Sequence, residues 1–331
     1  MPIVTTANLV PNLFDAKTIK ASGTRDGYGA ALVELGKQDP RVVVLCADLS
    51  ESTRSHLFQK AFPERYVQIG VAEQNLITVG AGLSAAGKIP FMASYAAFAP
   101  GRCWEQIRTT FGYNHLHGIV AGAHAGVSVG PDGATHQAVE DIATMRTIAS
   151  CTVLAPSDAV RAKQATMATL SEPHLWYIRF GRDKYPVFTT EQTPFAPGKA
   201  ELFYTGNDVT VIACGPLVYE ALQAAHQLEQ QGIGVEVIDA TTVKPLDVET
   251  IIKSVRKTNA VVTAEEATVI GGLGGAVAEA LGQHYPAPLE YVGMQDCYGQ
   301  SGTAEELLET YHMKAVDIVG AIHRVIKRKR A

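Results

Sequence analysis

The sequence lacks the features that mark secreted and membrane-spanning proteins. It has no basic-then-apolar segment of the signal-peptide type near its start, and no uninterrupted apolar run approaches the ~20 residues of a membrane helix. Cysteines are few, odd in number and without close paired spacing: Cys46, Cys103, Cys151, Cys214 and Cys297. This pattern predicts reduced thiols rather than a disulfide framework or a zinc site. We therefore expect a cytoplasmic protein that does not interact with a membrane.

An excess of charge of one sign is also absent. Charged residues make up 18% of the 331 residues, and the net charge is −5. The single basic run, residues 327–330, is expected to be a frayed, solvated C-terminus. Because no large basic surface is predicted, we expect no nucleic-acid partner. At about 150 residues per domain, the length suggests two domains.

From Thr24 onward, helical segments alternate with strand-like segments. A helix is expected at about 25–37, and apolar strands are expected at 42–46, 66–69, 89–93, 118–124, 152–155 and 175–180. A second series of strands is expected at 209–214, 235–238, 260–263 and 289–292. Continuous apolar strands separated by helices predict parallel sheets covered on both faces. The fold class is therefore α/β, with two three-layer α/β/α domains and mostly parallel sheets.

The domain boundaries follow from changes in composition. Residues 1–23 have no clear period and are predicted to form an N-terminal extension that wraps over a surface or a partner. The first domain is predicted to span residues 24–184. A segment rich in proline and threonine, 185–198, is predicted to be a linker, and residues 199–331 form the second domain.

Glu73 stands out in the first domain. Residues 66–75 are predicted to form a short strand, a turn at Gly70 and the start of a helix built from small and apolar residues. A carboxylate at the start of so apolar a helix has little water around it, so we expect a partner that shares its proton. The alternative is an acid that only stabilises the N-terminus of its own helix.

Other polar and aromatic side chains follow neighbouring strands. Asp48, Tyr95 and His124 each stand at a predicted strand end, where parallel sheets bind their ligands. Phe98 lies close to Tyr95 in the sequence; the alternative for this pair is that both are ordinary core aromatics. The histidines and aspartate of residues 124–136 could instead hold a metal, but their spacing matches no common metal motif, so no metal site is predicted.

Three segments together carry a family resemblance. Gly-Val-Ala-Glu-Gln (70–74), Tyr-Ala-Ala-Phe (95–98) and Asp-Gly-Ala-Thr-His-Gln (132–137) have the order and approximate spacing of the transketolase family of thiamine diphosphate enzymes, which the sequence resembles. The resemblance covers nearly the whole chain. It implies a pyrimidine-binding thiamin fold followed by a transketolase C-terminal domain.

The resemblance also implies cofactor-binding roles. In the family, the glutamate that matches Glu73 binds the pyrimidine ring nitrogen opposite the amino group, through a short, charge-assisted hydrogen bond. This bond favours the imino tautomer that removes the C2 proton of the thiazolium. Phe98 is expected to contact the ring and Tyr95 to form a pocket wall. Asp48 and Leu49 are assigned to the same pocket.

Substrate residues are implied in the same way. His124, Asp132 and His136 match residues that contact sugar hydroxyls, although Ala134 replaces the usual proline. Glu73, His124 and His136 are the expected catalytic residues, because histidines with a pKa near 6.5 can relay protons. A phosphate group is expected to be bound by three side chains: Arg25, Ser52 and Arg182.

Two family motifs are missing. Neither Gly-Asp-Gly nor Asn-Asn occurs in the sequence, and in the family these motifs hold the diphosphate and its metal. The resemblance therefore implies a separate N-terminal subunit that carries the diphosphate-binding domain with Mg²⁺ or Ca²⁺. The expected protein is the C-terminal subunit of a split transketolase that homodimerises within a heterotetramer. It would transfer two-carbon ketol units between sugar phosphates, as in the pentose phosphate pathway.

Three alternatives remain open. The beta subunit of a 2-oxo acid dehydrogenase has this domain pair, but carries a Gly-His-Gly-type loop where this sequence has residues 130–137. Deoxyxylulose phosphate synthase shares the Thr-His-Gln loop, but has an arginine where His124 stands, and Arg25 and Ser52 also favour transketolase. A non-catalytic partner subunit is the alternative from another class, and the presence of Glu73 and His136 argues against it.

Overall fold

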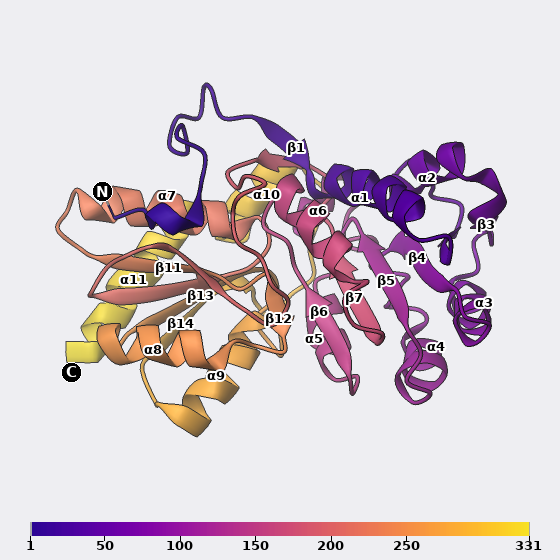
Figure 1. Cartoon of the computed structure of the whole chain (residues 1–331). Helices are drawn as coiled ribbons and strands as arrows, with labels where there is room; N and C mark the ends of the chain where they lie inside the picture. Colours follow the sequence, from indigo (N-terminus) through magenta and orange to yellow (C-terminus); the bar gives the residue numbers. More distant parts are fainter. Residues whose placement is uncertain (1, 331) are drawn as a thin grey trace.

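The computed structural model describes residues 2–330 and contains two α/β units that lie side by side (Figure 1). The first is built on a seven-stranded sheet in the order β12-β6-β7-β5-β4-β2-β3, in which only the β12–β6 pairing is antiparallel. Its strands are β2 (Val42–Cys46), β3 (Tyr66–Gln68), β4 (Ile89–Tyr95), β5 (Gly118–Ala123), β6 (Cys151–Leu154), β7 (Leu175–Arg179) and β12 (Thr242–Lys244). The parallel pairing brings the carboxyl ends of β2, β4 and β5 to one edge.

The second unit has a five-stranded sheet in the order β14-β13-β10-β11-β9. Only β9 is antiparallel to its neighbour. The strands are β9 (Glu201–Tyr204), β10 (Val209–Ala213), β11 (Val235–Asp239), β13 (Val261–Thr268) and β14 (Leu289–Met294). The predicted α/β class with two mostly parallel sheets is therefore confirmed.

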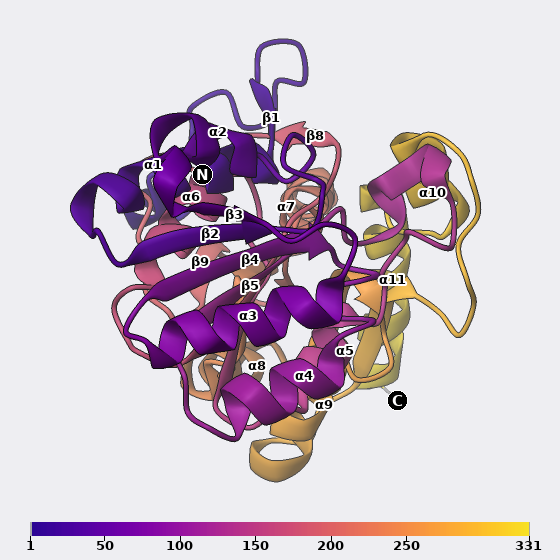
Figure 2. The ribbon, with the colours of Figure 1, turned by 90° about the vertical axis from the view of Figure 1, so that its right-hand side faces the viewer.

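Helices cover both faces of each sheet. Those of the first unit are α1 (Thr24–Gln38), α2 (Ser55–Ala61), η2 (Pro63–Arg65), α3 (Glu73–Ala85), α4 (Trp104–Gln106), the π-helix η3 (Ile107–Gly112), η4 (Val127–Asp132), α5 (Asp141–Arg146) and α6 (Ala159–Ala168). Apolar residues of α1, α2 and α6 pack on one face of the seven-stranded sheet, and those of α3, η3 and α5 pack on the other. Figure 2 shows α3 and α4 in the outer layer of this second face.

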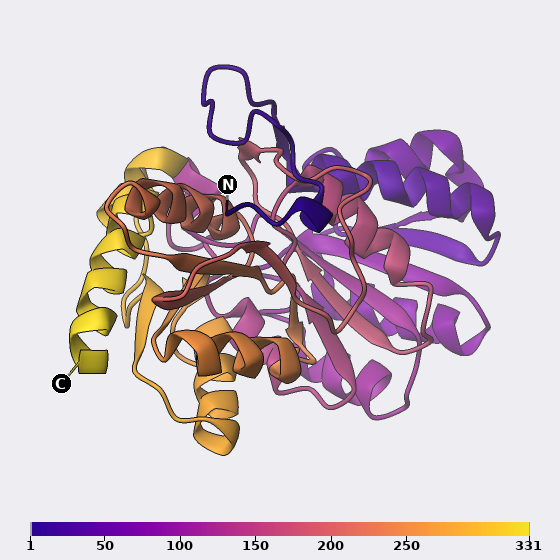
Figure 3. The same ribbon diagram turned by 60° about the vertical axis from the view of Figure 1, so that its left-hand side comes forward.

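The helices of the second unit are α7 (Leu217–Glu229), α8 (Val248–Thr258), α9 (Leu273–His284), α10 (Ala304–Thr310) and α11 (Ala315–Arg330). Helices α7 and α11 pack on one face of the five-stranded sheet, as seen in Figure 3, and α8 and α9 pack on the other. Among residues 2–330, no helix combines the length and apolar character needed to cross a membrane.

Two pairings were not foreseen from the sequence. The short strand β1 (Ala21–Gly23) pairs antiparallel with β8 (Lys184–Pro186), so the end of the extension is bound to the start of the predicted linker. Before β1, the chain, which includes η1 (Thr5–Ala7), lies over the second unit, where Phe14 stacks on His226 with ring centroids 4.0 Å apart. Strand β12 comes from the second half of the sequence but completes the first sheet.

The predicted fraying of residues 327–329 is wrong, because these residues continue α11. They are exposed, as the prediction of a solvated segment requires. Arg328 Nη1 donates to Glu290 Oε1 at 2.6 Å, and Lys329 Nζ donates to the carbonyl oxygen of Thr258 at 2.5 Å. An ion pair to β14 and a hydrogen bond to the end of α8 therefore hold Arg328 and Lys329 in place.

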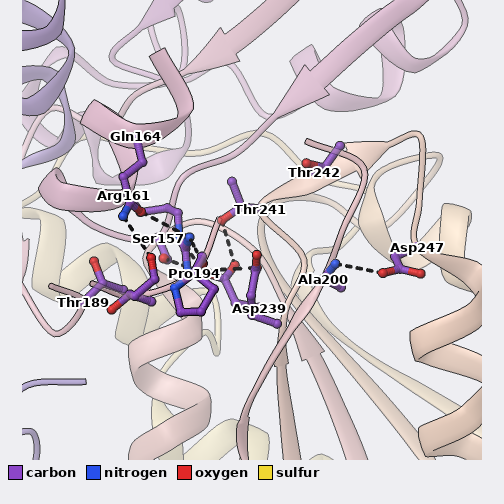
Figure 4. Close-up of polar contacts among 12 residues, drawn as sticks. Ser157, Arg161, Gln164, Thr189, Pro194, Ala200, Asp239, Thr241, Thr242 and Asp247 are labelled. Carbon is purple, nitrogen blue, oxygen red and sulfur yellow. Dashed lines mark hydrogen bonds and ion pairs between the residues drawn. The ribbon is translucent and has the colours of Figure 1, made fainter. Parts of the chain in front are cut away.

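A buried polar cluster ties residues 185–198 to both units (Figure 4). Asp158 caps α6 and also accepts hydrogen bonds from the backbone N–H and hydroxyl of Thr189. Arg161 is fully buried, donates to the carbonyl oxygen of Pro194 at 2.6 Å, and lies 3.5 Å from the carboxylate of Asp239. The connecting segment is therefore held by specific polar contacts along its length.

Candidate active site

Glu73 is the first residue of α3, after a turn in which Gly70 has φ +83°. Its side chain is 1% exposed, as its apolar surroundings predict. Two donors reach the carboxylate: Arg102 Nη1 at 2.7 Å from Oε2, and Ser94 Oγ at 3.4 Å from Oε1. The carboxylate is thus buried but paired.

Arg102 was not identified from the sequence, although it lies in the run that contains Phe98. Its guanidinium stands 4.6 Å from the centroid of the Phe98 ring, a cation–π distance, and its side chain is half exposed. The only sequence signal was an arginine four residues after an aromatic side chain, close to a strand end. Arg102 therefore links Glu73 to the aromatic pair.

His124 is the centre of a second group of contacts. It follows β5 with φ +55°, a left-handed conformation that is costly for a histidine and that clusters at functional sites. Its Nε2 lies 2.9 Å from Arg25 Nη1, which also donates to the carbonyl oxygen of Ser52 at 3.1 Å. The Tyr95 ring packs 4.3 Å from the His124 ring, and its hydroxyl donates to Ser52 Oγ at 3.1 Å.

His124 does not titrate near its ordinary value. Burial, together with the positive charges of Arg25 and Arg182, lowers the pKa of His124 to about 3. The pKa of His124 therefore lies below the value near 6.5 expected from the sequence, and the ring is neutral at pH 7. Because Arg25 donates to Nε2, the ring proton lies on Nδ1, which is buried and has no hydrogen-bond partner among residues 2–330.

Asp132 and His136 lie on the loop that begins with η4. Arg182 Nη1 donates to Asp132 Oδ1 at 3.0 Å and to the carbonyl oxygen of Val129 at 2.8 Å. The His136 ring stands edge-on to Phe98, with centroids 5.3 Å apart. The loop thus brings His136 to the aromatic pair and Asp132 to Arg182.

Asp48 and Leu49 follow β2 at the same edge of the sheet. Asp48 is exposed, has φ +58°, and its backbone N–H donates to Gln68 Oε1 at 2.9 Å. The carbonyl oxygen of Leu49 accepts a hydrogen bond from the backbone N–H of Thr53. Among residues 2–330, neither side chain forms a hydrogen bond with the group around His124, which consists of Arg25, Ser52, Tyr95 and His124 itself.

The geometry joins most of the predicted residues into one arrangement. A continuous chain of contacts links Arg25, Ser52, Tyr95, Phe98, His124 and His136. Glu73 connects to it through Arg102, and Asp132 is held beside it by Arg182. Within residues 2–330, no three His, Cys, Asp or Glu side chains are arranged to hold a metal ion.

Comparison with known proteins identifies the family. The model "Transketolase, pyrimidine binding domain" matches residues 20–187, and "Transketolase, C-terminal domain" matches residues 198–318. The chain belongs to the transketolase family. Both domains of the sequence resemblance are thereby confirmed.

Two transketolase subunits match this chain over nearly their whole length. The "6-deoxy-6-sulfo-D-fructose transketolase subunit SqwH" of Clostridium sp. (strain MSTE9) is 43% identical over 92% of this chain and 95% of its own. An apulose-4-phosphate transketolase subunit of Phocaeicola vulgatus is 32% identical over 92% of this chain and 97% of its own. A solved structure, "Split gene transketolase, inactive beta4 tetramer", superposes with a TM-score of 0.87 at 45% identity, over 93% of this chain and 99% of that chain.

The two transketolase domains imply dependence on thiamine diphosphate. The residues present fit the pyrimidine end of that cofactor. Glu73 offers a buried carboxylate, and its half-exposed partner Arg102 lies over an aromatic side chain, Phe98. A ring nitrogen can share such a carboxylate without leaving a buried charge unpaired.

Proposed function

We propose that this chain is the C-terminal subunit of a split transketolase. It transfers a two-carbon ketol unit from a ketose phosphate to an aldose phosphate, with thiamine diphosphate bound at an interface with a separate diphosphate-binding subunit. The observation that carries the proposal is the convergence of Arg25, His124 and His136 with the Tyr95–Phe98 pair beside the buried Glu73. The carboxylate and the aromatic rings can bind a cofactor ring, and the guanidinium and the histidines can bind a sugar phosphate.

Glu73 is proposed to hold the pyrimidine ring, with Phe98 against it and Tyr95, Asp48 and Leu49 in the pocket wall. When bound, thiamine diphosphate supplies the carbanion that accepts the two-carbon unit. The carboxylate of Glu73 binds the ring nitrogen, and its burial strengthens that hydrogen bond because little water competes for it. Arg102 keeps the carboxylate paired while the cofactor is not bound.

The sugar is proposed to lie between the His124 group and the loop that carries Asp132 and His136. Neutral His124 orients a hydroxyl through hydrogen bonding, while His136, at the edge of Phe98, is the proton-transferring group. Arg25, Ser52 and Arg182 bind the terminal phosphate. The named substrates of the two relatives, a sulfo-sugar and a sugar phosphate, both carry an anionic group that guanidinium side chains bind well.

The partner is proposed to be an N-terminal transketolase subunit that holds the diphosphate and its Mg²⁺ or Ca²⁺, in a heterotetramer with two copies of each chain. The word "subunit" in the names of both relatives, and the "split gene" and "inactive" of the solved tetramer's title, support this assignment. Val71, two residues before Glu73, is 74% exposed and is proposed to face this partner.

The test of the proposal is turnover by the purified chain with and without its partner. We expect no transfer from xylulose 5-phosphate to ribose 5-phosphate when the chain is supplied only with thiamine diphosphate and Mg²⁺. Addition of a subunit with the Gly-Asp-Gly and paired-asparagine motifs should restore it. Full turnover without a second polypeptide would refute the split arrangement.

A further inference from the structure

The loop that carries Asp132 and His136 is bound by a side chain from the second α/β unit. Glu266 lies in β13, is 2% exposed, and its Oε1 accepts a 2.7 Å hydrogen bond from the backbone N–H of Ser128. Gly126, two residues earlier, has φ +85°, and a Cβ there would lie 2.2 Å from the same carboxylate oxygen. Only glycine allows this close approach of loop and carboxylate.

A second contact comes from residues 299–302, which precede α10. Gln137 is buried, and its Nε2 donates at 2.9 Å to the carbonyl oxygen of Gln300. A Cβ at Gly133, with φ +74°, would lie 2.8 Å from Ser301 Oγ. The second unit therefore packs along the loop on the residues next to Asp132.

The first unit holds the other side of the same loop. Arg182 donates to the carbonyl oxygen of Val129 at 2.8 Å, and the hydroxyls of Ser128 and Tyr185 are hydrogen-bonded. Contacts from both units therefore hold the loop at neighbouring residues, and together they determine the positions of its side chains. Those positions matter because a misplacement of about 1 Å can lower the rate by a factor of about 100.

We propose that Glu266 is a positioning residue for sugar binding, through which the second unit sets the placement of Asp132 and His136. This inference rests on the proposed function, because it assigns the two loop residues to the sugar. It also assigns a role to the transketolase C-terminal domain. This domain provides the hydrogen-bond acceptor, the carboxylate of Glu266, that holds the loop carrying Asp132 and His136.

A matched control stands next to Glu266 in the same strand. Glu265 is also buried, and its carboxylate accepts hydrogen bonds from the backbone N–H groups of Leu273 and Gly274, both at 2.7 Å. These donors belong to the start of α9, and side chains of successive strand residues point to opposite faces. Glu265 therefore makes the same kind of bond without touching the loop.

The experiment compares Glu266→Ala, Glu266→Gln and Glu265→Ala in the full chain. Hydrogen–deuterium exchange of residues 126–137 is measured on the chain, and kcat and KM for xylulose 5-phosphate on the complex with its partner. For Glu266→Ala we expect faster exchange in this segment, a KM raised about tenfold and a kcat lowered by a similar factor, because the loop carries both Asp132 and His136. Glu266→Gln keeps an acceptor oxygen and should restore all three, whereas Glu265→Ala should alter none of them.

Equal effects of Glu266→Ala and Glu265→Ala on KM, or no rescue by Glu266→Gln, would overturn the proposal. If Glu266→Ala does not fold, Gly126→Ala tests the same contact from the loop side and should raise KM in the same direction. The exchange measurement needs no substrate and no partner. If the loop opens in Glu266→Ala but the complex of the natural chain with its partner has no transketolase activity, the proposed function and the sugar-positioning role are refuted and only the structural contact remains.

Discussion

Arg102 donates a 2.7 Å hydrogen bond to Glu73, although the arginine side chain is 50% exposed and the glutamate side chain only 1%. The buried carboxylate is therefore paired with a charge that faces solvent. The same guanidinium lies over Phe98. A ring nitrogen that binds Glu73 must share the carboxylate with Arg102, so the pair matters both for stability and for ligand binding.

Replacement of Arg102 by alanine should destabilise the chain by about 1–3 kcal/mol, because it leaves the buried carboxylate of Glu73 short of a donor. In a Glu73→Gln background the same replacement should cost much less. Urea unfolding of the four members of this double-mutant cycle measures the coupling. Additive effects of the two substitutions would contradict a specific Glu73–Arg102 interaction.

Replacement of Glu73 by glutamine should lower turnover of the assembled enzyme at least 100-fold, because a neutral amide cannot give the ring nitrogen the same charge-assisted bond. Assembly with the partner, measured by analytical ultracentrifugation, should be unchanged. Glu64→Gln, at a residue whose side chain is 69% exposed, is the control and should retain activity. An unchanged rate for Glu73→Gln would favour a non-catalytic subunit.

Replacement of Arg25 by glutamine should raise KM for xylulose 5-phosphate about 10- to 100-fold, which corresponds to the loss of a hydrogen bond to a charged group. The effect on unphosphorylated xylulose should be much smaller, since it has no phosphate to bind. Arg41→Gln is the control, because Arg41 precedes β2 at the opposite edge of the sheet and pairs with Asp39. Equal losses with both sugars would argue against a phosphate-binding role.

His124 should remain neutral throughout the physiological range, because its pKa lies at about 3. In NMR spectra of the chain with ¹³C-labelled histidine, one ring resonance should not move between pH 5 and 8. His124→Gln identifies that resonance by removing it. A His124 signal that titrates near pH 6.5 would show that the arginines do not exclude its charged form.

Glu201, whose carboxylate lies 4.0 Å from the buried guanidinium of Arg161, should make the stability of the fold depend on pH. Burial raises the pKa of Glu201 from 4.5 to about 8; Arg161 opposes this effect, and the like charge of Asp239 adds to it. The folded chain therefore binds the proton of the Glu201 carboxyl more tightly than the unfolded chain does. The resulting stabilisation of the fold is complete below pH 4.5 and is lost as the pH rises through 8.

Glu201→Gln mimics the protonated side chain. The variant and the natural chain should therefore melt alike near pH 4.5, and the variant should melt a few °C higher above pH 8. Differential scanning calorimetry across this range makes the measurement. A difference in melting temperature between the two proteins that does not grow with pH would contradict the shifted pKa of Glu201.

The sequence was informative where long apolar strands define the sheet. The strand ends near Asp48, Tyr95 and His124 could be placed because continuous apolar runs predict buried parallel strands. Strand β12 could not be placed, because its three residues have no period and its partner β6 is distant in the chain. A short strand takes its position from the tertiary fold rather than from local propensity.

The same reasoning explains what was missed in the site. The bond between Glu73 and Arg102 depends on the path of the chain after β4, for which the sequence has no regular pattern. The shift in the pKa of His124 depends on burial and on two arginines that only the fold brings near it. The hydrogen bond between Glu266 and Ser128 joins residues 138 positions apart and likewise could not be predicted from the sequence.

Strand β12 also constrains how this chain can be divided. A polypeptide that stopped at residue 198 would retain every other strand of the seven-stranded sheet, yet the outer side of β6 would lose its partner. Unpaired strand edges recruit further strands from other molecules. Residues 1–198 expressed alone should therefore aggregate, unless residues 242–244 are fused to them.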